Sequence, residues 1–568
     1  MKTKTPKLGT ALILAAIGGL VFAACSSGSM AREDISTGGD ENAGGQFDNG
    51  SAGIAPQNPS SGIFFNDQDP NKPPVKFNQD IRGRFEHIYD EDPNVEPDGR
   101  PSTGEPYYEF FKKYGTNPFV DTEDDRLSTF AVDVDTGSYT KCRDYLNRGY
   151  MPPDEAPRTE EFVNFFDYNY EAPRDSAFAI DVAGAPSRYG QDLKNCYLLR
   201  VGMQAKRIDP LERKPAILTF VIDVSGSMDM ENRLGMVKRA LKLLVNQMTE
   251  RDRIGIAVYG DRGYKILDHT VATETETIMS AITRLQPDGS TYAEEGIRVG
   301  YQMAADSFRE GYINRVILCS DGVANVGNTS TEKILETIAE NRRKGITLST
   351  IGFGMSNYND TLMEQLGDKG DGHYAYVDTI DEAKRVFVDN LTGTLQVVAR
   401  DTKVQVEFNP SVVKSYRLLG YENRDVADED FRNNSVDGGE VGSGHSVTAL
   451  YEVKLFEKVT GPICTATMRW KHDEKQEFIE LNKEVFVKDL AASWEEAPAN
   501  MRLAANAAEF AELMKKSYWA KKGSYDELLK DTKSLINETD DTSVLELATL
   551  ITKARDLSKE AAGTAGGE

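Results

Sequence analysis

The chain has 568 residues, with 66 lysines and arginines against 91 aspartates and glutamates, and only five cysteines. This length predicts about three to four folded units, large enough to bury apolar cores without disulfide bonds. The net charge of −25 repels phosphate backbones and anionic lipid, so we expect no nucleic-acid partner and no adsorption to acidic membrane surfaces.

The first segment is basic and then apolar. Lysines within the first seven residues precede small and apolar residues at 8–24, a pattern typical of a secretory signal peptide. Residues 22–25, Phe-Ala-Ala-Cys, resemble the bacterial lipobox, although Phe22 replaces the more usual Leu or Val. The resemblance implies that residues 1–24 are removed and that Cys25 is lipidated, for example with palmitate, which anchors the chain without spanning the membrane. An ordinary cleaved signal with an incidental Cys25 is the alternative.

Residues 25–115 are rich in Gly, Ser, Asn, Asp and Pro and show no sustained apolar periodicity. Such a composition does not bury enough apolar surface to fold, so we expect a disordered tether. The acidic stretch at 90–99 lacks the regular spacing and the terminal Glu of a calcium-binding loop. We therefore expect no calcium site there.

Residues 116–213 form an N-terminal flanking region with both strand and helix patterns. Short strands and helices are predicted at 130–134, 140–147, 160–166, 178–182 and 197–201. The motif Asp135-Thr-Gly-Ser138 spells the aspartic-protease signature, but those enzymes need two carboxylates and no second copy occurs in a matching setting. We expect instead a turn from a strand into a helix with a capped start.

From 214 to 392 apolar, strand-like runs alternate with amphipathic helices. The clearest strands are 216–222, 254–259, 316–319 and 347–353. In the helix at 234–248 apolar residues recur at three- and four-residue steps. Apolar strands separated by helices predict an α/β domain with a doubly wound, mainly parallel sheet, which binds ligands at the carboxyl ends of its strands.

Polar side chains follow two of these strands directly. Asp223, Ser225 and Ser227 come after the first strand, and Asp321 comes after the third. Thr291 lies between them in the sequence, behind Asp-Gly-Ser. All five side chains offer oxygen atoms, which are the ligands that Mg²⁺ and Mn²⁺ prefer. The sequence therefore predicts a divalent metal site at this edge of the sheet.

This set of residues closely resembles the metal-ion-dependent adhesion site of von Willebrand factor type A domains, whose fold is α/β and Rossmann-like. The resemblance implies direct ligation by Ser225 and Ser227, and ligation by Thr291 either directly or through water. It implies a mainly water-mediated role for Asp223 and Asp321. It also implies that an Asp or Glu of a protein partner completes the coordination of Mg²⁺ or Mn²⁺.

Other segments resemble a family of bacterial envelope lipoproteins, in which an A domain lies between a dedicated N-terminal region and a C-terminal region of unknown function. The segments are 117–122, 128–139, 321–327, 352–360 and 444–451. The resemblance covers most of residues 117–530. Two loop features stay open. Ser290 is the less favoured alternative to Thr291 as a metal ligand. Residues 260–263 carry Asp-Arg where relatives usually show small apolar residues, and these charges would alter the choice of ligand if the loop borders the metal.

Residues 393–490 form a β-rich region. Strands are predicted at 404–408, 447–454, 465–470 and 478–485. We expect strands from both flanks to pair into one β-sandwich with the α/β domain inserted between them. Residues 491–560 are predicted to be helical, and the apolar stripe that begins at Met501 favours packing in a core over binding of a partner.

Four cysteines follow Cys25 at wide spacing, which fits neither a disulfide-dense scaffold nor a zinc site. Cys319 ends an apolar strand, so we expect it to be buried like a small apolar side chain. A disulfide bond among Cys142, Cys196 and Cys464 is compatible with an oxidising compartment. The sequence leaves that pairing open.

The five histidines are scattered, and the sequence contains no H-E-x-x-H motif, G-x-S-x-G motif or P-loop. We therefore expect a protein that is not an enzyme. It would be anchored by lipid in the bacterial cell envelope, on the outer membrane in a Gram-negative cell, facing the periplasm or the outside. Its metal would capture an acidic side chain of a protein partner. The alternative is an envelope assembly or chaperone-like scaffold in which the metal is structural.

Overall fold

The computed structural model describes residues 111–190, 192–322, 328–354, 359–472, 476–539 and 541–565. The predicted signal peptide, Cys25 and nearly all of the predicted tether lie outside these residues. In the part of the chain that is described, no helix combines the length and the apolar character needed to cross a membrane.

A six-stranded sheet forms the centre of the α/β domain, in the strand order β10-β9-β8-β5-β6-β7. The strands are β5 (Ala216–Asp223), β6 (Arg253–Tyr259), β7 (Gly263–Val271), β8 (Ile313–Ser320), β9 (Ile346–Phe353) and β10 (Tyr374–Val377). Five strands run parallel, and only the edge strand β7 is antiparallel to its neighbour. The expected mainly parallel sheet is confirmed.

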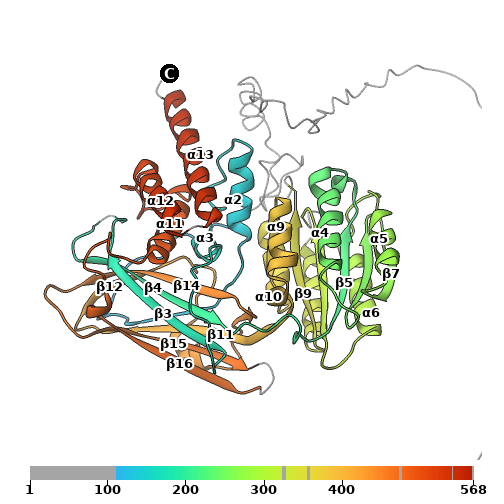
Figure 1. Cartoon of the computed structure of the whole chain (residues 1–568), viewed down its shortest axis with the longest axis horizontal. Helices are drawn as coiled ribbons and strands as arrows, with labels where there is room; N and C mark the ends of the chain where they lie inside the picture. Colours follow the sequence, from blue (N-terminus) through green and yellow to red (C-terminus); the bar gives the residue numbers. More distant parts are fainter. Residues whose placement is uncertain are drawn as a thin grey trace, which may run out of the picture. The chain divides into compact units, whose positions relative to one another are not determined.

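Helices cover both faces of this sheet (Figure 1). They are α4 (Met236–Val245), α5 (Thr275–Thr283), α6 (Ala293–Asp306), α7 (Asn328–Arg342), α8 (Asp360–Lys369), α9 (Ile380–Lys384) and α10 (Leu391–Leu395). Alternate residues of β5 point into two separate cores: Phe220 packs with α4, α5, α9 and α10, whereas Val221 packs with α6, α7 and α8. Because both faces are buried, the strand is apolar at nearly every position before Asp223.

The flanking regions build a two-sheet β-sandwich. One sheet has the order β1 (Val120–Asp121), β12 (Val413–Leu419), β14 (Ser446–Leu455), β4 (Cys196–Ala205) and β3 (Phe178–Pro186). The other has the order β13 (Gly439–Gly442), β11 (Val397–Phe408), β15 (Pro462–His472) and β16 (Phe478–Phe486), with β2 (Leu127–Ala131) also paired to β11. All of these pairings are antiparallel.

Strands from both flanks share each sheet of the sandwich. Val201 of β4 lies opposite Ala449 of β14, and Phe130 of β2 lies opposite Val404 of β11. These four side chains are buried in one core between the sheets. The α/β domain is therefore an insertion between β4 and β11 of a single sandwich.

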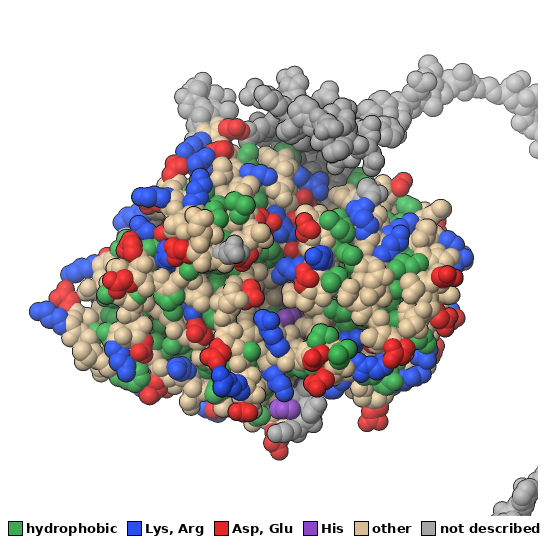
Figure 2. All heavy atoms as spheres, in the orientation of Figure 1, with side chains coloured by type: hydrophobic (Ala, Val, Ile, Leu, Met, Phe, Trp, Pro, Cys, Tyr) green, Lys and Arg blue, Asp and Glu red, His purple; other side chains and the backbone are tan. Residues whose placement is uncertain are grey.

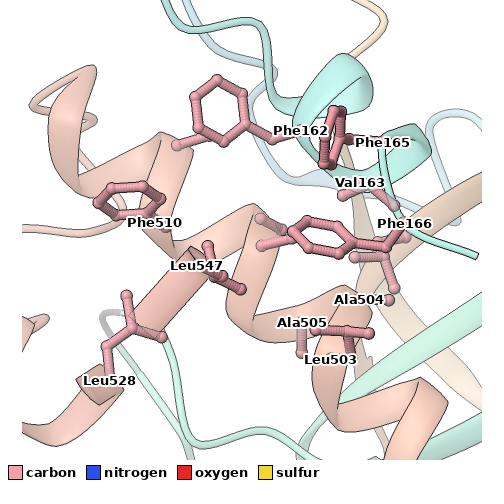
Figure 3. Close-up of a cluster of buried hydrophobic side chains, with 14 of the residues drawn as sticks. Phe162, Val163, Phe165, Phe166, Leu503, Ala504, Ala505, Phe510, Leu528 and Leu547 are labelled. Atoms are coloured by element: carbon pink, nitrogen blue, oxygen red, sulfur yellow. The ribbon is translucent and has the colours of Figure 1, made fainter. Parts of the chain in front are cut away.

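A layer of helices packs against the outer face of one sandwich sheet. It combines α2 (Gly137–Asn147) and α3 (Thr159–Asn164) with α11 (Ala499–Met514), α12 (Tyr525–Thr539) and α13 (Thr542–Ala565). Figure 3 shows Phe162 and Phe166 facing Leu503, Phe510 and Leu547 across this layer. The apolar stripe of the tail thus packs in a core, as expected.

The Asp135-Thr-Gly-Ser motif forms the predicted turn into a helix, but the predicted cap is wrong. Thr136 occupies the N-cap position of α2 and makes no side-chain capping hydrogen bond. Its hydroxyl accepts a hydrogen bond from Arg385 Nη2 at 2.8 Å instead. The Thr136 side chain therefore contacts the α/β domain and does not cap the helix, although the local sequence predicts that it would.

Buried ion pairs connect the α/β domain to the flanks. Arg143 of α2 forms two parallel hydrogen bonds with Asp378, Nε–Oδ2 at 2.7 Å and Nη2–Oδ1 at 2.6 Å. The same guanidinium contacts Glu382 of α9 and Glu546 of α13, each at 3.0 Å. Charges buried in this way are tolerated only when they are paired.

Two further arginines also link the α/β domain to the flanks, the first in a buried ion pair and the second in a partly exposed one. Arg158, just before α3, lies 2.5 Å from Asp360 of α8, and Arg424, after β12, lies 2.6 Å from Asp368 of α8. We call the contacts of Arg143, Arg158 and Arg424 with their carboxylate partners the interdomain joint. The joint holds the β10 side of the α/β domain against the flanking helices and the sandwich.

Candidate metal centre

The loop after β5 brings the first three predicted ligands together. The backbone N–H of Ser225 donates to Asp223 Oδ1 at 2.8 Å, which turns the chain directly after the strand. The hydroxyls of Ser225 and Ser227 then lie 3.0 Å apart. The strand end and the short turn that follows it therefore place two hydroxyls and one carboxylate at the same edge of the sheet.

The fourth predicted ligand, Asp321, follows the neighbouring strand β8. Ser320 at the end of β8 donates its hydroxyl to Asp223 Oδ2 at 2.9 Å, so both carboxylate oxygens of Asp223 already accept hydrogen bonds. Asp321 is 5% exposed and Asp223 is fully buried. An Asp223 carboxylate occupied in this way suits the water-mediated role that the family resemblance implies.

The loop that carries Thr291 is hydrogen-bonded to the first loop. The Gly226 N–H donates to the Gly289 carbonyl at 2.8 Å, and the Asp288 N–H donates to the Val224 carbonyl at 2.5 Å. Thr291 itself is half-buried. These backbone bonds hold the segment before Thr291 against the loop of the two serines.

The contacts of Asp261 distinguish Ser290 from Thr291 as candidate ligands. Its carboxylate accepts hydrogen bonds from the backbone N–H and the hydroxyl of Ser290, each at 2.7 Å. Gly289 lies against the same carboxylate at φ 71°, where a Cβ would come within 2.2 Å of Asp261 Cγ. The charged loop at 260–263 thus borders the metal-site loop, and it engages the Ser290 hydroxyl while leaving Thr291 as the candidate ligand.

Burial is the largest influence on the pKa of the Asp223 and Asp321 carboxyls. It raises the pKa of Asp223 to about 6, and the nearby charge of Asp321 adds to the effect. Burial also raises the pKa of Asp321, although Arg233 and the Ser227 hydroxyl counteract it. Two buried carboxylates at close range favour a proton or a cation between them.

The donor set fits a small, hard cation. Octahedral ligands about 2.1 Å from Mg²⁺ stand about 3.0 Å apart along an edge, and the hydroxyls of Ser225 and Ser227 have this separation. The buried carboxylates of Asp223 and Asp321 supply negative charge beside them. Asp223, Ser225, Ser227, Thr291 and Asp321 are therefore the residues that would hold the metal.

A second group of carboxylates lies at the interdomain joint. Asp133, Glu161 and Glu364 place oxygen atoms within 4.8 Å of one another. Arg158 contacts Glu161 and lies 3.5 Å from Glu364, and Arg424 lies 3.0 Å from Asp133. Because each carboxylate already faces a guanidinium, we assign this group to the joint and not to a metal. Local sequence patterns do not reveal this group, since its members come from distant segments and form no motif.

A cavity of 680 Å³ lies between the α/β domain and the flanks. Its lining includes Asp135, Phe165 and His445 from the flanks and Ile351 and His373 from the α/β domain. The ring centroids of the two histidines are 5.3 Å apart. Burial lowers the pKa of His445 to about 4, helped by the positive charges of nearby arginines, and lowers that of His373 as well.

This histidine pair predicts acid sensitivity. His445 stays neutral in the folded chain, whereas the unfolded chain binds a proton near pH 6.5, so its contribution to stability is present above pH 6.5 and is lost as pH falls toward 4. In urea unfolding at pH 7 and pH 5, we expect His445→Gln to lose less stability on acidification than the wild type does. An equal loss in both proteins would contradict the assignment.

All four cysteines in the described part of the chain are buried and free. Cys319 is buried as expected, and burial raises its thiol pKa. No disulfide bond joins Cys142, Cys196 and Cys464 in this structure.

Comparisons with known families agree with this architecture. Residues 218–394 match the family model of the von Willebrand factor type A domain, residues 105–195 match one described as von Willebrand factor, and residues 393–462 and 457–557 match the C-terminal model of uncharacterized protein YfbK. The central α/β domain is therefore a von Willebrand factor type A domain.

Individual relatives cover larger parts of the chain. It is 37% identical to uncharacterized protein YfbK of Escherichia coli over 353 residues, which is 61% of each chain. It is 30% identical to uncharacterized protein sll0103 of Synechocystis over 43% of this chain and 56% of the relative. Human inter-alpha-trypsin inhibitor heavy chain H3 is 25% identical over 43% of this chain and 29% of the relative. These matches span less than two thirds of each relative.

Among solved structures, a von Willebrand factor type A protein from Catenulispora acidiphila covers 70% of this chain and 89% of its own, at 13% identity and a TM-score of 0.39. The crystal structure of the ArnB paralog VWA2 from Sulfolobus acidocaldarius covers 67% and 98%, at 12% identity and a TM-score of 0.33.

Proposed function

We propose that the protein is a non-enzymatic binding protein of the bacterial cell envelope that is anchored through a lipid on Cys25. In this proposal Mg²⁺ or Mn²⁺, held at the candidate metal centre, captures an Asp or Glu side chain of a protein partner. The observation that carries the proposal is the pair of hydroxyls of Ser225 and Ser227, 3.0 Å apart beside two buried carboxylates.

The chemistry of the ligands supports capture of an acidic group. Serine and threonine hydroxyls are neutral, and Asp223 already accepts two hydrogen bonds from the protein. A hard cation in such a site keeps most of its positive charge and favours an additional anionic oxygen ligand. A carboxylate on a partner protein provides one.

A capture experiment tests the proposal. The full chain, lipidated in a bacterial membrane, is crosslinked to neighbouring proteins in Mg²⁺ or in EDTA, as wild type and as Asp223→Ala. We expect crosslinked partners that disappear in EDTA and in the variant. Asp268→Ala serves as the control, because this carboxylate of β7 is 82% exposed. Equal crosslinking in EDTA, unchanged by Asp223→Ala, would contradict metal-dependent capture.

The interdomain joint favours a second candidate function, an envelope assembly scaffold with a structural metal. Its arginines tie the A domain to the flanking helices and, through Arg424, to the sandwich, so the domain is presented in a fixed orientation. In that case crosslinked partners would persist in EDTA, and removal of the metal would lower the melting temperature instead.

A further inference from the structure

Arg233 places a positive charge inside the candidate metal centre. Its Nη1 donates to Asp321 Oδ2 at 2.7 Å and to the Ser227 carbonyl at 2.5 Å. The side chain is 4% exposed, so water does not screen this charge effectively. One carboxylate of the site is thus already engaged by a cation that belongs to the protein.

The absence of a side chain at Gly354 leaves space for the Arg233 side chain. Gly354 follows β9 at φ 76°, and a Cβ at this position would lie 2.4 Å from Arg233 Cγ and 2.7 Å from its Nε. Any larger residue at 354 would displace the side chain. The guanidinium is therefore held in place from both sides, by Asp321 at one end and by the close approach of the backbone at the other.

Formal charges show what this arginine changes. Asp223 and Asp321 together carry two negative charges, which would neutralise a divalent cation by themselves. With Arg233 present, the metal and these three side chains leave one surplus positive charge in a buried setting, where such an excess is unfavourable, and the positive charge of Lys141 also acts on Asp321. A single carboxylate from outside removes the surplus charge.

We propose that Arg233 is an internal cation that competes with the divalent metal for Asp321, lowers the affinity of the empty site for metal, and makes metal binding depend on a carboxylate ligand. This inference rests on the proposed metal site and deepens it. Arg233 acts as a coupling residue: metal and acidic partner bind together more tightly than either binds alone.

The test compares wild type with Arg233→Met, which keeps the length of the side chain and removes its charge, and with Arg233→Lys, which keeps the charge. Mg²⁺ affinity is measured by calorimetry on the full chain without its signal peptide, in the absence and in the presence of acetate as the carboxylate probe. Melting in EDTA verifies that each variant is folded, and Arg233→Gln replaces Arg233→Met if the latter does not fold.

We expect Arg233→Met to bind Mg²⁺ at least about tenfold more tightly than wild type and to lose the gain in affinity that acetate gives the wild type. Arg233→Lys should stay close to wild type. If wild type binds Mg²⁺ and Arg233→Met binds it equally or more weakly, the inference is overturned and the metal site stands. If no variant binds Mg²⁺ or Mn²⁺, the proposed metal site fails and takes this inference with it.

Discussion

The double variant Ser225→Ala, Ser227→Ala is expected to lose Mg²⁺ binding, with an affinity reduced by about 100-fold or more. These two hydroxyls are the side chains with the spacing of direct ligands, 3.0 Å. Removing them leaves two buried carboxylates without the neutral oxygens that complete a coordination shell. Calorimetry with Mg²⁺, or electron paramagnetic resonance with Mn²⁺, measures the loss.

Ser290→Ala is the matched control for this variant. Ser290 lies in the neighbouring loop, but its hydroxyl donates to Asp261 at 2.7 Å, so its removal should leave metal affinity within about threefold of wild type. A large loss in Ser290→Ala together with a small one in the double variant would reverse our assignment of the ligands.

Arg143→Leu is expected to lower the free energy of unfolding by about 3–5 kcal/mol. The substitution leaves Asp378 and Glu382 without their shared guanidinium, and both carboxylates are nearly inaccessible to solvent. Burial already raises the pKa of Asp378 to about 6 despite the arginine. Urea unfolding followed by circular dichroism measures the change.

Arg432→Leu is the control for Arg143→Leu. Arg432 also forms two parallel hydrogen bonds with one carboxylate, that of Glu480, both at 2.9 Å. Its side chain is 65% exposed, so its loss should cost no more than about 1 kcal/mol. Similar losses for the two variants would show that burial does not set the strength of the interdomain joint.

The parallel sheet could be predicted because the apolar run of each strand is visible in the sequence without knowledge of its neighbours. The strand β5 is apolar on both faces, which predicts a buried parallel strand. The loop of predicted ligands follows it at once, which marks the carboxyl end of that strand. The strand β12 escaped prediction for the opposite reason. Its buried face includes Arg417, whose charge is neutralised by Glu452 and Glu512. In the sequence, an arginine that is buried in an ion pair cannot be distinguished from one on the surface.

The predicted metal ligands could be recognised in the sequence, whereas the interdomain joint could not. Asp223, Ser225 and Ser227 lie within five residues of one another, so their chemistry is visible in the sequence. Arg233 follows soon after, yet its contact with Asp321 depends on the close approach of Gly354, which follows β9. Contacts of that kind depend on the fold and cannot be deduced from local spacing.

The surface in view (Figure 2) carries charged side chains of both signs, although the net charge of the chain is strongly negative. Figure 2 shows lysine, arginine, aspartate and glutamate side chains interspersed on the face in view. On this face the charges do not gather into one broad patch of a single sign. On this face, specificity therefore has to come from particular sites.

The insertion of the A domain between β4 and β11 has a mechanical consequence. A pull on the N-terminal end of the described chain enters the sandwich at β1 and β2, which are hydrogen-bonded to β12 and β11. A pull applied at the candidate metal centre would enter through β5 and β8. The two loads meet at the connections to β4 and β11 and at the interdomain joint, which act in parallel. The interdomain joint therefore shares with these two covalent connections any load that passes between the sandwich and the A domain.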